Sequence, residues 1–560
     1  MLGERSRQGS LFAADTQYLE FVGQESFYGF LARHGRELFG DADFAGFYCA
    51  DNGRRSVPPS RLAIALLLQT HDRVSDGEAK QRADFDLRWK VALGLEIEER
   101  PFAKSTLQLF RAQLVIHEAA QSIFRRSLEY ARAKGYLKGR KMRVALDTTV
   151  IFGRGAVEDT YNLIGHGIRH LCEAPEAWAA ARGLERYFAS SLKATAEVDW
   201  DHAASREAFL TAIIHDGERA LELAREARSS LAEGSAEDQR IVAAAELLTQ
   251  LLWQDVEPTE AGYRIQQGTA KDRVPSVHDP EQRHGRKSHG KTFTGHKGAV
   301  AVDTETQLIT AVEALPGNAS DGETAAALVE ASEANTGMEV EQVLGDTAYG
   351  SLETREALGE REVIAPTVHP HRGRSLSKAD FDIDVPGERV RCPEGHATTR
   401  WTWATVTPGV GKPKVRVKRF HFPPDLCRAC PRYAECVTDK QSRGRTITLH
   451  PDEERLQAAR AFEQTDYFRE QYRKRVVVEH RIARLVQLGI RQSRFRGRKM
   501  TAFQLLMAAT VANLTLVAGW EAAQGLFRRV SAAAQAVWRR ISALGRPTTL
   551  WRAIPISLAA

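Results

Sequence analysis

The sequence predicts an α/β protein built around a mixed sheet, because strand-like segments alternate with helical ones in its middle part. The run RVALDTTVI at 143–151 is apolar and rich in β-branched residues, which is typical of a buried strand. Two further strand patterns, 298–303 and 308–315, are separated by TETQ and indicate a hairpin. The pattern continues with a helix after Asp321 and with strands at 340–346 and 361–368.

Helical patterns occupy the chain on both sides of these strands. The first 135 residues read as helices, and the most apolar of them, LAIALLLQ at 62–69, follows Pro58 and Pro59, which mark a boundary. Such short helices suit either a plain helical bundle or a small DNA-binding unit. Further helices are predicted within 160–265, at 451–464 and onward with a break to 490, at 501–518, and at 526–544.

Composition places the chain among ordinary globular proteins. Of 560 residues, 43% are hydrophobic and 27% charged, which excludes a disordered chain and indicates several domains. No uninterrupted apolar run reaches the roughly 18 residues of a membrane helix, and the charged start lacks a signal peptide's apolar core. We therefore expect a soluble, cytoplasmic protein with no membrane partner. The basic amphipathic helix at 526–544 is expected to pack on its own domain.

Positive charge is concentrated in one segment near the C-terminus. The net charge is only +6, yet residues 469–499 hold eleven Lys or Arg against two acids, Glu470 and Glu479. A local excess of this size favours a polyanionic partner, with nucleic acid as the first candidate. The alternative is a solvated basic face. A second basic stretch, 271–299, carries Lys291 and Lys297 as candidate phosphate contacts.

Three acids are candidates for metal-dependent chemistry. Asp147 interrupts an apolar strand, Asp346 follows the strand ending VLG, and Glu479 lies in the apolar and basic run VVVEHRIARL. A set of carboxylates can hold two Mg²⁺ ions that stabilise both oxygens of an in-line phosphoryl displacement. Taken singly, each acid could instead be a hydrogen-bond acceptor, a cap or an arginine partner. Tyr472, Arg475 and Glu479 are spaced to share one face of a helix.

The segment YRKRVVVE resembles the Y-x2-R-x3-E signature of DDE transposases of bacterial insertion sequences. The likeness extends to LDTTVIFGRGAVEDTYNL, KTFTGHKGAVAVD, GNASDGET and VLGDTAYGS, and to RQSRFRGRKM after the glutamate. The N-terminal RLAIALLLQ and PFAKSTLQLFR also resemble that family's helical domain. These short motifs are weak singly, but they occur in the right order over most of the chain.

The resemblance implies an RNase H-like catalytic core in which Asp147, Asp346 and Glu479 bind Mg²⁺ or Mn²⁺. Tyr472 and Arg475 would lie near the bound DNA end. The family signature commonly continues E-x6-K, but the position of that lysine, seven residues after Glu479, is Val486 in this chain. Three arginines could supply that charge instead: Arg484, Arg491 and Arg494.

The function implied by the resemblance is DNA transposition. Hydrolysis would free a 3′-hydroxyl at the element's end, and that hydroxyl would then attack a target strand. The partners implied are double-stranded DNA, as terminal inverted repeats and target, and further copies of the chain in at least a dimer. Two alternatives remain: a related nuclease that cuts without joining, and a non-catalytic DNA-binding protein derived from a transposase.

The same resemblance and the patterns above suggest a division of the chain. The expected parts are a helical N-terminal domain (1–135) that binds DNA, a catalytic core (140–163, 265–370 and 451–520), a helical insert (164–264), a turn-rich insert containing cysteines (371–450) and the basic tail (521–560).

Four of the six cysteines fall in the turn-rich insert with the spacing C-x34-C-x2-C-x5-C. Four thiolates can close a tetrahedral Zn²⁺ site, and a CxxC pair suits that geometry. Reduced thiols without metal and a redox disulfide are the alternatives, and His396 could replace one sulfur ligand. Zinc-dependent hydrolysis is disfavoured because four thiolates leave no open position. The candidate ligands are Cys392, Cys427, Cys430 and Cys436.

Overall fold

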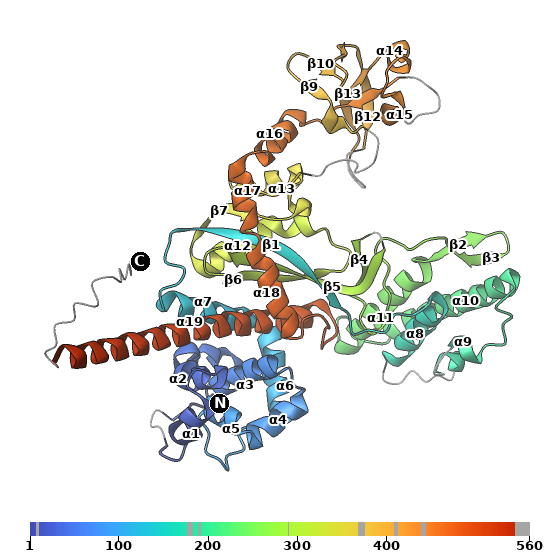
Figure 1. Ribbon diagram of the computed structural model, residues 1–560. Helices are drawn as coiled ribbons and strands as arrows, with labels where there is room; N and C mark the ends of the chain where they lie inside the picture. Colours follow the sequence, from blue (N-terminus) through green and yellow to red (C-terminus); the bar gives the residue numbers. More distant parts are fainter. Residues whose placement is uncertain are drawn as a thin grey trace. The chain divides into compact units, whose positions relative to one another are not determined.

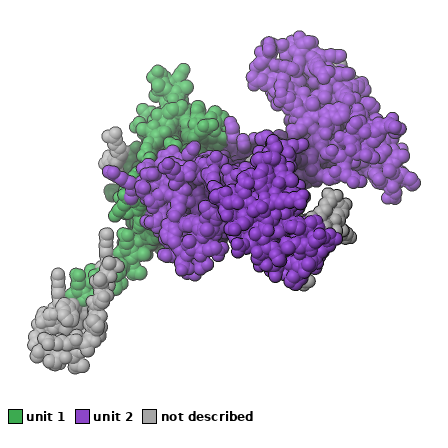
Figure 2. Space-filling model, turned by 90° about the horizontal axis from the view of Figure 1, so that it is seen from above, with its two compact units in different colours: residues 1–138, 484–490, 503–560 green, residues 139–483, 491–502 purple. Residues whose placement is uncertain are grey.

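The computed structural model describes most of the chain, and it separates into two compact units (Figure 2). The first unit comprises residues 1–138, 484–490 and 503–560, and the second comprises residues 139–483 and 491–502. The described residues are 1–6, 10–175, 183–188, 192–288, 290–367, 376–407, 413–437 and 444–543. His289 of the second basic stretch and the end of the predicted tail, 544–560, therefore lie outside the described residues.

The first unit is helical, as predicted for the N-terminal part. Pro59 begins α3, and every residue from Leu62 to Gln69 on that helix is buried, which confirms the apolar helix expected there. The N-terminal helices of this unit are α1 (Ala14–Val22), α2 (Phe27–Leu38), α3 (Pro59–Asp72), α4 (Asp76–Phe85), α5 (Leu87–Leu93), α6 (Lys104–Ile116) and α7 (Ala120–Ala133), with a 3-10 turn at Asp41–Phe47.

The second unit contains a six-stranded mixed sheet, which confirms the predicted α/β class (Figure 1). Strand β1 lies in the middle, antiparallel to β5 on one side and parallel to β7 on the other. Strands β4 and β6 both pair antiparallel with β5, and β8 pairs parallel with β7. The strands are β1 (Lys141–Phe152), β4 (Arg283–Ser288), β5 (Lys291–Asp303), β6 (Ile309–Pro316), β7 (Glu339–Leu344) and β8 (Glu362–Ile364).

The predicted strands occur where expected, with changes in length. The hairpin of β5 and β6 is confirmed, but β5 begins at Lys291 rather than at 298, because its first half pairs with β4. The last strand is shorter than 361–368. Helix α12 (Ala325–Thr336) packs on β5, β6 and β7, where the buried Ser332 and Thr310 hydroxyls form a hydrogen bond of 2.8 Å.

Two further parts of this unit have cores of their own. The helices of the first part pack on one another around buried Leu, Ile and Ala side chains, and a two-stranded hairpin follows them. They are α8 (Thr160–Glu173), α9 (Leu192–Thr195), α10 (Ala203–Arg228) and α11 (Ala236–Trp253), with β2 (Val256–Thr259), β3 (Gly262–Ile265) and a 3-10 turn at Glu185–Phe188.

The second part is the cysteine-containing region, which folds as two small three-stranded sheets. It contains β9 (Asp382–Asp384), β10 (Arg389–Arg391), β11 (Ala397–Thr398), β12 (Trp401–Val406), β13 (Val415–His421), β14 (Thr446–Thr448), α14 (Pro424–Arg428) and α15 (Tyr433–Cys436).

The C-terminal helices differ from the prediction in one respect. The expected break lies between α17 and α18, but the helices predicted at 501–518 and 526–544 are one continuous helix, α19, whose interior Gly519 and Gly525 do not interrupt it. A glycine inside a helix costs only about 1 kcal/mol, which the buried N-terminal half can offset. The helices are α16 (Glu453–Glu463), α17 (Asp466–Arg473), α18 (Val476–Gln487) and α19 (Arg498–Ala543).

The expectation that the tail packs on its own domain is wrong for its described apolar side chains. Leu526, Phe527 and Val530 are 59%, 66% and 60% exposed. A helix of 46 residues is about 69 Å long, more than a small domain can cover. By length and composition α19 is also the one described helix that could cross a membrane, although 72% of its most apolar window is buried and Asn513 within it is fully buried.

Candidate active site

Asp147 and Asp346 come together because their strands are parallel neighbours. Ala145 of β1 pairs with Leu344 of β7, and each acid follows its paired residue by two positions. Both carboxylates therefore reach the same edge of the sheet. Asp346 caps the next turn, its Oδ1 accepting the Ala348 N–H at 2.9 Å.

The Asp147 side chain lies in a protected environment. It is 22% exposed, and its Oδ1 accepts the backbone N–H of Thr148 at 2.7 Å. Burial raises the pKa of Asp147 to about 6, and the negative charges of Asp346 and Asp321 act in the same direction, whereas the Thr148 N–H and Arg475 oppose the shift. A carboxylate whose charged form is disfavoured in this way is a candidate functional group.

Arg475 connects two of the predicted acids. Its Nη1 donates to Oδ2 of Asp147 at 3.3 Å, and its Nη2 donates to Oε1 of Glu479. The prediction of one continuous helical face for Tyr472, Arg475 and Glu479 is wrong, because α17 ends at Arg473 and α18 begins at Val476. Arg475 lies in the turn between them, where its guanidinium stands 5.8 Å from the centre of the Tyr472 ring.

Two residues that the sequence prediction missed belong to this cluster. Asp321 lies in a 3-10 turn (Asp321–Thr324) after β6, and Tyr349 lies in another (Thr347–Tyr349) after β7. Tyr349 is 1% exposed, and its hydroxyl has no hydrogen-bond partner among the described residues. Burial raises the pKa of this hydroxyl, with further contributions from Asp321, Asp147 and Asp346. The motifs GNASDGET and VLGDTAYGS contain both residues and were the available signal.

The cations proposed for DNA contact have different surroundings. Lys297 is half-buried, and its Nζ donates to Asp321 Oδ1 and to the Ala319 carbonyl, both at 2.7 Å. Lys291 is exposed at the start of β5. The charge of Lys297 is therefore offset inside the protein, whereas that of Lys291 faces solvent.

Among the arginines considered for the position of Val486, Arg491 contacts β1 two and three residues beyond Asp147. Its Nη1 donates to Thr149 Oγ1 at 3.3 Å and to the Val150 carbonyl at 3.1 Å. Thr149 lies two residues beyond Asp147 on β1 and so projects from the same face. The Arg494 carbonyl accepts a hydrogen bond from Arg154. Arg484 belongs to the other compact unit, where its Nη1 donates to Gln487.

The acidic cluster contains residue types that bind metals, but the guanidinium of Arg475 lies between two of its carboxylates. Within the described parts of the chain, no three His, Cys, Asp or Glu side chains stand close enough together to hold an ion. At the acidic cluster, Arg475 lies between Asp147 and Glu479. The four cysteines of the turn-rich region, in contrast, line one small cavity together with His396.

Three family models match the chain in succession. The model described as Transposase domain (DUF772) matches residues 18–113, and two models described as Transposase DDE domain match residues 266–391 and 391–518. The last two include Asp321, Asp346 and Glu479. No curated protein and no solved structure matches the chain. Transposase domains at both the helical N-terminal part and the part carrying Asp346 and Glu479 show that the chain belongs to the DDE transposases of insertion sequences.

Proposed function

We propose that this transposase binds the terminal DNA of its own element and catalyses phosphodiester hydrolysis followed by strand transfer. The observation that carries the proposal is the convergence of Asp147, Asp346 and Glu479, which lie on three distant segments, around Arg475. The mixed sheet, antiparallel over β6, β5 and β1 and parallel over β1, β7 and β8, supports the RNase H-like core that the resemblance implies.

The residue types present, three carboxylates, suit a divalent cation. Carboxylate oxygens are the ligands that Mg²⁺ and Mn²⁺ prefer. The buried Tyr349 hydroxyl, without a partner among the described residues, and the raised pKa of Asp147 both mark a place where polar groups are incompletely compensated. Asp147, Asp346 and Glu479 would hold the metal. When bound, divalent ions would stabilise negative charge on the attacking and leaving oxygens at phosphorus.

The reaction needs no protein nucleophile. In the first displacement water attacks phosphorus, the bond between phosphorus and the 3′-oxygen breaks, and the 3′-oxygen leaves as a hydroxyl. In the second, that hydroxyl attacks a phosphorus of the target strand and displaces the target's 3′-oxygen. The forked guanidinium of Arg475 can orient a phosphate and neutralise its charge. Arg491, which contacts β1 just beyond Asp147, is our candidate for the charge that Val486 lacks.

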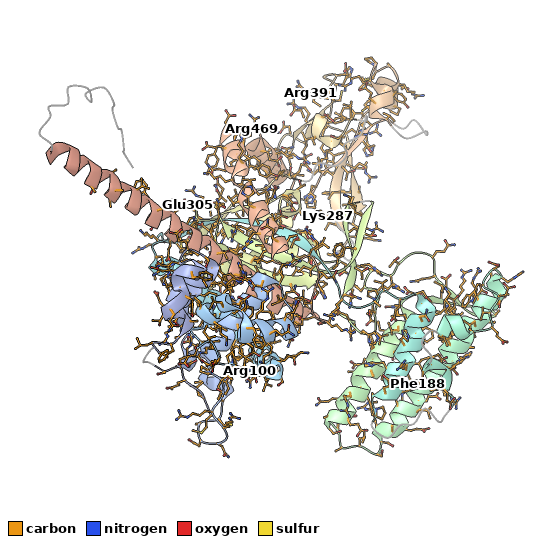
Figure 3. The ribbon with its side chains drawn as sticks, turned by 60° about the horizontal axis from the view of Figure 1, so that its bottom comes forward. Arg100, Phe188, Lys287, Glu305, Arg391 and Arg469 are labelled. Atoms are coloured by element: carbon orange, nitrogen blue, oxygen red, sulfur yellow. The ribbon has the colours of Figure 1, made fainter. Side chains whose placement is uncertain are left out.

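The proposed partner is duplex DNA, bound through the basic segment 469–499. Arg473, Arg496 and Lys499 are exposed, so their charges are open to phosphates. Arg469 on α17 (Figure 3) is also exposed, but it is paired with Asp466 at 2.9 Å. Joining two element ends requires two active sites, so we propose a homodimer or larger assembly on DNA. We also propose that the protein acts in the cytoplasm, where its element's DNA is located.

The decisive experiment combines purified protein, Mg²⁺ and a plasmid carrying the DNA that flanks the coding region. Nicking at the element's ends followed by joining to a second plasmid supports transposition. End cutting without joining would favour the nuclease, which requires no second displacement. Specific binding without cutting in Mg²⁺, Mn²⁺ or Ca²⁺ would favour the non-catalytic DNA-binding protein. Inverted repeats in the flanking DNA would further distinguish transposition from simple cutting.

Changing Arg475 to Lys is expected to slow end cleavage about 10- to 100-fold, with DNA affinity changing little. Lysine keeps the charge but cannot donate through a fork to Asp147 and Glu479 together, and a charged hydrogen bond contributes about 1.5–3 kcal/mol. Single-turnover cleavage and end binding should be measured for this variant and for Arg473→Lys, an exposed neighbour on α17. Equal cleavage rates in the two variants would refute the role of Arg475.

Changing Arg496 to Gln is expected to reduce the dependence of DNA binding on salt. Neutralising one phosphate contact lowers the slope of log affinity against log salt by about 0.9. The matched control is Arg225→Gln, an exposed arginine on α10 outside the basic segment. Affinity should be measured from about 50 to 200 mM salt. An unchanged slope for Arg496→Gln would remove this residue from the DNA-binding surface.

A further inference from the structure

The four cysteines of the turn-rich region face one another across a single cavity. Cys392 follows β10, Cys427 ends the first turn of α14, Cys430 follows that helix, and Cys436 ends α15. Together with His396 they line a cavity of about 30 Å³. Thus residues separated by as many as 44 positions in the chain line the same cavity of a small fold.

Two tight turns present these thiols. In the first, the Cys430 N–H donates to the Cys427 carbonyl at 3.1 Å. In the second, the Gly395 N–H donates to the Cys392 carbonyl at 2.9 Å, and the Cys392 N–H donates to the His396 carbonyl at 2.8 Å. The backbone N–H of Arg445 also points at Cys427 Sγ, 3.4 Å away. An N–H donor directed at sulfur favours the thiolate, which is the form that binds metals.

The region also has little else to stabilise it. Its two sheets have only three strands each, several of two or three residues. Among the described residues of this region, the buried core has eight members, one of which is Cys427 itself. Small folds with cores of this size are usually held by disulfides or a structural metal. All six cysteines of the chain are free, so no disulfide performs this role here.

Four thiolates gathered at one cavity repel one another, and a cation at the centre would remove that repulsion. Because the thiols surround the cavity without standing at ligand distance from one point, they would close on an ion by rotating about their Cα–Cβ bonds.

We propose that Cys392, Cys427, Cys430 and Cys436 bind one structural Zn²⁺ ion as four thiolates. Zinc favours tetrahedral sulfur ligands, and four of them leave no open position for substrate or water. The ion therefore stabilises the turn-rich region and takes no part in phosphoryl transfer. His396 lines the cavity but acts through its backbone carbonyl, which holds Cys392.

The test uses the full-length protein, purified under reducing conditions without chelator. Elemental analysis is expected to find about one zinc per chain, and Co²⁺ exchanged into the site should show the absorption of tetrahedral thiolate coordination. Cys430→Ser is expected to lose most of the zinc. His396→Ala and Cys49→Ser, the latter an exposed cysteine of the other unit, should retain it.

Several results would overturn the proposal. Wild-type protein that contains no zinc and gives no thiolate absorption with Co²⁺ would show that the thiols are simply reduced. Four rather than six titratable thiols in denaturant would show a disulfide. Loss of zinc in Cys49→Ser would place the ion elsewhere. Because the wild-type measurements need no variant, the proposal can be refuted even if Cys430→Ser does not fold.

Discussion

Changing Asp346 to Asn is expected to lower the rate of end cleavage by about a thousandfold without unfolding the protein. Electrostatic groups aimed at a reacting centre contribute about a hundredfold to a thousandfold each. Asparagine removes the charge that Asp346 brings to the edge shared with Asp147. Its amide oxygen can still accept the Ala348 N–H, so the turn after β7 keeps its cap.

The matched control is Asp303→Asn, which lies toward the other end of the strands in the same sheet. Asp303 ends β5 and pairs with Val144, three residues before Asp147 on β1. Its carboxylate accepts hydrogen bonds from the Thr306 N–H and hydroxyl, and both bonds lie within the turn between β5 and β6. Cleavage should be measured with thermal unfolding for both variants. A folded Asp346→Asn protein that cleaves at the wild-type rate would exclude this residue from catalysis.

Changing Asp147 to Asn is expected to stabilise the protein at pH 8 in the absence of divalent metal, while abolishing cleavage. The pKa of Asp147 is about 6, above the ordinary value of 3.8, so ionisation disfavours the folded state. The stability contributed by the protonated carboxyl is complete below pH 3.8 and is lost as the pH rises through 6. A difference of about two pKa units corresponds to a gain of up to about 3 kcal/mol for the uncharged variant.

The measurement is the thermal unfolding of both proteins in chelator, at pH 8 and at pH 4. The gain should appear at pH 8 and shrink to about half a kcal/mol at pH 4, where Asp147 is protonated in the folded state and about half protonated in the unfolded state. Asp201→Asn, which removes an exposed charge before α10, should show no comparable gain. If Asp147→Asn were less stable than wild type at pH 8, the ion pair with Arg475 would outweigh the cost of burial.

Much of the sheet, and the three candidate acids, could be predicted from patterns of neighbouring residues in the sequence. A strand pattern depends on neighbouring residues, so RVALDTTVI predicted β1 and the hairpin patterns predicted β5 and β6. An acid inside an apolar strand is conspicuous because burying charge is costly, which made Asp147 a candidate. Asp346 and Glu479 were found from their positions next to a strand and a basic segment, and the family resemblance joined the three.

The features that the sequence did not predict depend on contacts between distant parts of the chain. Helical spacing placed Arg475 and Glu479 on one face, but the break between α17 and α18 sets the contact of Arg475 with Asp147. The ion pair of Lys297 with Asp321 was not foreseen either, because nothing nearby in sequence indicates it, and the DNA contact of Lys297 stays a prediction. The 526–544 helix was expected to pack, since local amphipathicity does not say whether a partner surface exists.

Local chemistry in the chain was thus enough to locate the strands, the three acids and the cysteine spacing, because period, polarity and turn residues act over a few positions. Tertiary structure decided which groups meet: parallel pairing of β1 with β7 brought Asp346 to Asp147, and turns after β6 and β7 added Asp321 and Tyr349. Such contacts join segments roughly 200 residues apart, and their formation depends on how whole elements pack, which no local pattern encodes.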